Sequence, residues 1–77
     1  MLTPEETQKA IDNNEEPRPK AYLVGLDSNA FILIGHVSGA LRRAGASKEH
    51  INAFMKEAMS GDYAHLLGVC GKFSEVS

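Results

Sequence analysis

The chain has 77 residues, 43% of them apolar, and a formal net charge of −2. That length has room for one small domain. No apolar run approaches the ~20 residues of a membrane span, and no cationic start with an apolar core and cleavage site indicates secretion. Cys70 is the single cysteine and cannot form an internal disulfide, which is typical of a reducing compartment. We therefore expect a soluble, cytoplasmic protein.

Size and charge placement bear on partners. A domain of roughly 60 residues buries only about 60% of its unfolded surface, so a single copy is marginal and we expect a homo-oligomer. Residues 1–17 carry a net charge of −4 and the rest of the chain +2. This basic excess is too small to indicate nucleic-acid binding by charge alone. It is compatible with a small anionic ligand.

The N-terminal residues predict a helix with a weak attachment. Thr3, Pro4 and Glu6 follow the order of an N-cap, a first-turn proline and a capping-box acid. The apolar side of this helix is thin, and an acidic stretch with two prolines comes after it. We expect residues 1–19 to form a loosely attached acidic arm and residues 20–77 to form a small α+β domain.

The domain elements follow from apolar spacing, capping residues and alternation. The pattern predicts a strand over 20–26, a helix over 30–44 stopped by Gly45, a helix from Ser47 to about 60, a helix from Tyr63 to about 71, and a strand over 72–76. The predicted fold class is α+β and mainly helical, in the order strand, three helices, strand.

The residue types that support catalysis or metal binding are few and poorly spaced. The soft metal ligands are His36, His50, His65 and Cys70. None has the spacing of a metal site, so solvated histidines and a buried, inert thiol are the preferred interpretation. Asp62 is interpreted as a helix cap and Glu57 as part of a solvated face. We expect no enzyme, no cofactor and no metal.

One constellation suggests a ligand. The helix predicted over 30–44 begins with free amides that favour an anion and carries cations towards its end, and two aromatic residues are available for base stacking. The predicted ligand-binding residues are Asn29, Phe31, His36, Arg42, Arg43 and Tyr63. The plainer alternatives are that Asn29 only caps, that both arginines only complement the helix dipole, and that Tyr63 only completes the core.

Gly35 and Gly39 lie on the same predicted helix. Each costs roughly 1 kcal/mol of helix stability relative to alanine, so something is expected to approach the backbone closely. We favour packing of another helix over a second subunit or a ligand.

Five segments carry a family resemblance: Asn29-Ala30-Phe31, Gly35-His36-Val37-Ser38, Ala40 to Gly45, Phe54 to Tyr63 and His65-Leu66-Leu67. Through them the sequence resembles, over roughly residues 20–77, a family of short proteins encoded by bacteriophages, prophages and plasmids. The chain departs from the family pattern at Gly39 and in the glycine-rich segment 68–71. The family is uncharacterised, so the resemblance implies a phage setting and the cytoplasm of a host bacterium without implying a reaction.

Small phage proteins without catalytic motifs often act by binding. Our first hypothesis is a non-enzymatic, oligomeric anti-defence protein that sequesters a nucleotide-type immune signal between subunits. The second is an inhibitor or adaptor that binds a host or phage protein through the acidic arm or an exposed helix face. A DNA-binding helix-turn-helix over residues 30–59 is the third. The nearly neutral candidate recognition helix argues against it.

Overall fold

The computed structural model describes residues 2–23, 25 and 28–76. These residues form a small, mainly helical domain with a short two-stranded sheet. The elements in chain order are α1 (Pro4–Asp12), β1 (Lys20–Ala21), α2 (Ala30–Arg43), α3 (Lys48–Ala58), α4 (Tyr63–Phe73) and β2 (Glu75–Val76). The predicted order of strand, three helices and strand is confirmed, and α1 is the helix predicted ahead of it.

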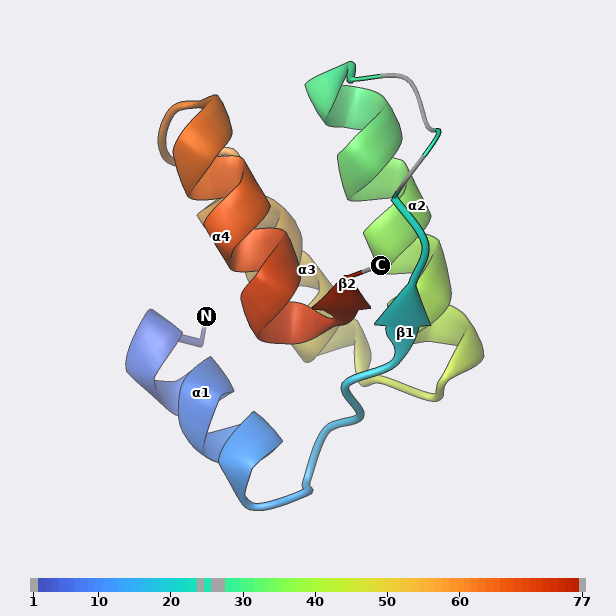
Figure 1. Cartoon of the computed structure of the whole chain (residues 1–77). Helices are drawn as coiled ribbons and strands as arrows, with labels where there is room; N and C mark the ends of the chain where they lie inside the picture. The colour runs from blue at the N-terminus through green and yellow to red at the C-terminus, as the bar shows by residue number, and fades with distance from the viewer. Residues whose placement is uncertain (1, 24, 26–27, 77) are drawn as a thin grey trace.

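The core lies among α2, α3 and α4. Figure 1 shows α4 in front of α3 with α2 beside them, and α1 below at the edge of the bundle. Phe54 and Phe73 are fully buried and meet edge to face, with ring centroids 5.2 Å apart. Leu41 and Val37 of α2 are also fully buried. The apolar stripes read from the sequence therefore face one another.

Both strands are shorter than predicted. β1 and β2 pair in parallel within the chain, with Lys20 opposite Glu75 and Ala21 opposite Val76. Part of the strand predicted over 20–26 lies outside the described residues. The predicted strand over 72–76 loses its first residues to α4, because Phe73 continues the helical stripe of Leu66 and Cys70 into the core.

The helix ends follow the predicted capping chemistry. Thr3 caps α1 in a complete capping box with Glu6. Ser47 and Asp62 cap α3 and α4 by accepting hydrogen bonds from backbone amides. After α2, Gly45 adopts φ +88° and donates its amide to the Arg42 carbonyl. Glycine adopts this left-handed conformation readily because it has no Cβ atom to clash with the backbone.

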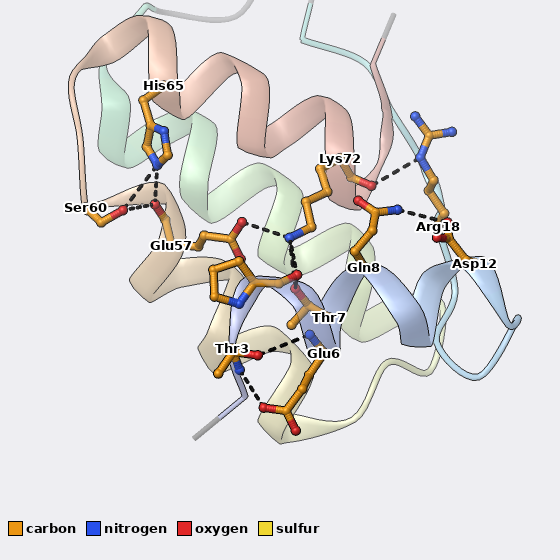
Figure 2. A network of polar contacts seen from close by, with 11 residues as sticks. Thr3, Glu6, Thr7, Gln8, Asp12, Arg18, Glu57, Ser60, His65 and Lys72 are labelled. Atoms are coloured by element: carbon orange, nitrogen blue, oxygen red, sulfur yellow. Dashed lines mark hydrogen bonds and ion pairs between the residues drawn. The ribbon is translucent and has the colours of Figure 1, made fainter.

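The N-terminal segment folds back onto the domain, in contrast to the loosely attached arm that we expected. Thr7 of α1 is fully buried. The Lys72 ammonium on α4 donates hydrogen bonds of 2.9 Å to the Pro4 carbonyl and the Thr7 hydroxyl. It also pairs with Glu57 Oε1 on α3 at 2.9 Å (Figure 2). These hydrogen bonds add to the apolar attachment of α1, in which Ile11 packs partly buried against the core.

The linker between α1 and β1 completes two other helix ends. Glu16 accepts hydrogen bonds from the Ser47 amide (3.0 Å) and hydroxyl (2.6 Å) at the start of α3. Burial opposes its ionisation, yet the bonds from Ser47 leave the pKa of Glu16 below its ordinary value of 4.5. Arg18 donates to the carbonyls of Gly71 (2.7 Å) and Lys72 (3.3 Å) at the end of α4. Both charges have the sign that the helix dipole favours.

Two expectations about polar residues are wrong. Glu57 is not part of a solvated face, because its side chain is only 14% exposed and is held by Lys72. His50 is not solvated, because it is fully buried against Phe73 with the ring centroids 4.9 Å apart.

Among the described residues, no helix is long and apolar enough to cross a membrane.

Candidate functional site

An apolar groove opens where the first turns of α2 and α4 meet the end of α3. It has a volume of about 340 Å³ and is lined by Ala30, Phe31, Ile34, Ala58, Met59, Gly61, Asp62, Tyr63 and Leu66. Phe31 and Tyr63, predicted independently as stacking residues, both line it. Phe31 is 76% exposed and Tyr63 42% exposed, so both rings are accessible to a ligand.

The groove is built by helix caps. Asn29 caps α2, and its side-chain oxygen accepts a hydrogen bond of 2.9 Å from the Phe31 amide. Asp62 caps α4 by accepting a bond of 2.9 Å from the His65 amide. These two caps fix the backbone immediately next to Phe31 and Tyr63. In the structure Asn29 therefore has the capping role that was the alternative to anion binding.

The two predicted arginines lie at the other end of α2. Arg42 lines a second depression of about 380 Å³ together with Lys48, Asn52 and Met55 of α3. The step from Phe31 to Arg42 covers about 16 Å along the helix axis, from the rise per residue of an α-helix. One subunit therefore does not bring the aromatic and cationic halves of the predicted site together.

Arg42 and Arg43 are exposed, and within the described part of the chain neither guanidinium group takes part in a hydrogen bond or an ion pair. A Cβ atom added at Gly39 would lie 3.4 Å from Arg43 Nη1, so the Arg43 side chain covers this glycine. His36 is half-buried in the middle of α2 and lines neither depression.

The glycine pair does not receive another helix of the same chain. Gly35 is exposed, and a Cβ atom added there would meet nothing within 4 Å. At Gly39 the neighbour is a side chain of the same helix. The preferred interpretation, close packing of another helix, is wrong within this chain, so the two remaining alternatives, a second subunit and a ligand, stay open.

Comparison with known proteins assigns no family. No family model, curated protein or solved structure matches this chain.

The described residues contain no group of three or more His, Cys, Asp or Glu that could hold a metal ion. Cys70 is fully buried, and burial raises the pKa of its thiol above the ordinary value of 9.0. A thiol in this state is a poor nucleophile at neutral pH.

The sequence did not indicate the aliphatic walls of the groove. Met59 follows the last turn of α3 and is 54% exposed. Its exposure, together with that of Phe31, distinguishes this end of the bundle from an ordinary core edge. Apolar periodicity does not indicate that Met59 is exposed, because Met59 lies just after the end of α3.

Proposed function

We propose that the protein is a non-enzymatic, oligomeric binding protein that sequesters a nucleotide-type ligand. The observation that supports this best is that Phe31 and Tyr63, from different helices, both line one groove and have exposed side chains. Stacking of a base on an aromatic side chain contributes about 1–3 kcal/mol. A groove of about 340 Å³ has room for a base and part of its sugar.

The phosphate contacts in this proposal come from a second copy of the chain. Arg42 and Arg43 are too far along α2 to reach the phosphate of a mononucleotide whose base lies in the groove of the same subunit. Their guanidinium groups are unpaired among the described contacts, and guanidinium groups bind phosphate in a bidentate manner. A ligand held between subunits would combine the two halves. The resemblance to phage-encoded proteins supports an anti-defence role in a host bacterium.

Replacing Phe31 by alanine should weaken nucleotide binding by tenfold or more, because one stacking surface is lost. Isothermal titration with cyclic mononucleotides, cyclic dinucleotides and ADP-ribose measures the effect. The melting temperature should change little, since Phe31 is 76% exposed. Tyr22→Ala is the matched control, because this aromatic is 63% exposed and lies outside the groove. Equal affinity in both variants contradicts the site.

Native mass spectrometry tests the proposal as a whole. The protein purified from infected or defence-expressing bacteria should be an oligomer that carries a mass of nucleotide size. A strict monomer that binds none of the panel contradicts the proposal.

The second candidate is binding of a host or phage protein through the same groove. Its lining is mainly apolar, with Asp62 as the charged member, which suits an apolar side chain of a partner. Deleting residues 1–19 does not distinguish the two functions, because Lys72 and Ser47 lose their partners in that segment. Phe31→Ala serves better. Under this alternative it should abolish capture of the partner, and no nucleotide of the panel should bind the unmodified chain.

A further inference from the structure

The turn between α3 and α4 is held by His65. Its Nε2 atom lies 2.9 Å from the Glu57 carbonyl oxygen and 3.1 Å from Ser60 Oγ (Figure 2). A carbonyl only accepts hydrogen bonds, so Nε2 carries the hydrogen in this arrangement. Ser60 Oγ donates its own hydrogen to the same carbonyl at 2.7 Å and so is also an acceptor towards the ring. The imidazole therefore ties the last turn of α3 to the first turn of α4.

Gly61 makes this contact sterically feasible. A Cβ atom added at Gly61 would lie 2.7 Å from Cγ and 2.9 Å from Cβ of His65. Because Cβ does not move with a change of rotamer, the backbone of the turn would have to shift together with the ring. The φ angle of Gly61 is not in the left-handed region, so alanine would be tolerated by the backbone. Gly61 is required by the ring of His65.

We infer that His65 is a positioning residue for the groove, held on the backbone of Gly61. One wall of the groove is formed by Met59, Gly61, Asp62 and Tyr63. The first three lie between the end of α3 and the start of α4, and Tyr63 is the first residue of α4. If the ring leaves, this wall moves relative to Phe31 on the opposite side. The inference about ligand affinity rests on the proposed function, whereas the inference about the wall does not.

The test compares His65→Ala and Gly61→Ala with His65→Gln, which keeps a hydrogen-bond donor at the position of Nε2. The nuclear Overhauser contacts that the Tyr63 ring makes in the unmodified chain should be lost in both alanine variants and recovered in His65→Gln. Affinity for cyclic di-AMP, measured by titration calorimetry, should fall about tenfold in the same two variants. Arg18→Ala is the control, because it removes the Gly71 and Lys72 bonds at the far end of α4.

The outcomes separate the inference from the proposed function. Unchanged Tyr63 contacts in both alanine variants overturn the positioning role of His65. The same loss of Tyr63 contacts in Arg18→Ala also overturns it, because the effect would then follow from general destabilisation. If the contacts are lost as expected while the unmodified chain does not bind cyclic di-AMP, the positioning role is supported and the nucleotide proposal loses support.

Discussion

Replacing Lys72 by methionine should lower the free energy of unfolding by about 2–4 kcal/mol. The Lys72 side chain is 17% exposed, and its ammonium contacts the Pro4 carbonyl, the Thr7 hydroxyl and Glu57 Oε1, each at 2.9 Å. Methionine keeps the length of the side chain and removes the charge. Glu57, whose side chain is 14% exposed, is then left without its partner, and unpaired charges of low exposure are costly.

Thermal and urea unfolding measure this effect. A loss of 1 kcal/mol shifts the melting temperature by about 4–8 °C in a domain of this size, so the expected shift is about 8–30 °C. Lys9→Met on the exposed face of α1 is the matched control. Amide exchange should rise throughout α1 in Lys72→Met, since that nitrogen anchors α1. A melting temperature like that of Lys9→Met would show that the attachment of α1 does not depend on this ammonium.

A double-mutant cycle with Glu57→Gln isolates the ion pair. Each single substitution removes the interaction between the two charges, so their effects should be less than additive. Additive effects would mean that Lys72 acts through Pro4 and Thr7 of α1 alone.

The attachment of α1 shows where sequence reasoning fails. The local sequence was sufficient to predict this helix, and Thr3 caps it as predicted. The sequence did not predict that α1 packs against the domain, because this packing involves a hydrogen bond from Lys72, which lies at the other end of the chain. Periodicity reports which face a helix buries in an apolar core. It gives no signal for polar contacts such as those of Lys72 with Pro4 and Thr7.

At the candidate site, too, the sequence predicted the residue types but not how they are grouped in space. The sequence predicted Phe31 and Tyr63 as stacking residues, and the fold brings both to one groove. It also grouped them with Arg42 and Arg43, which the length of α2 separates from the groove within one subunit. Residue type indicated the chemistry at each end. Distance along a helix decided which groups one subunit can combine.

Replacing His50 by methionine should remove a loss of stability that the protein otherwise suffers in mild acid. His50 is fully buried, and both ring nitrogens lack a hydrogen-bond partner among the described residues. Burial lowers its pKa below the ordinary value of 6.5, opposed by the carboxylates of Glu16 and Glu57 and supported by the ammonium of Lys72. Methionine has a similar volume and no group that titrates.

The direction of the effect follows from proton binding. Between the lowered pKa of the folded state and the ordinary value near 6.5, the unfolded chain binds more protons at this position than the folded chain does. The free energy of unfolding therefore falls as the pH drops below about 6.5. Each unit by which the pKa is lowered corresponds to about 1.4 kcal/mol. Above that pH the histidine stays neutral in both states and contributes no pH dependence.

Urea unfolding of both proteins at about pH 7.5, pH 6 and pH 5 measures the difference. At about pH 7.5 the methionine variant should be equal to the unmodified protein or more stable by about 1 kcal/mol, since unpaired buried nitrogens are costly while the ring contact with Phe73 is favourable. The difference should widen as the pH falls, because only the unmodified chain must keep an imidazole neutral in its core. Carboxylates that do not interact with His50 titrate alike in both proteins and cancel. Parallel pH profiles would show that another group, not His50, sets the acid limit of the fold.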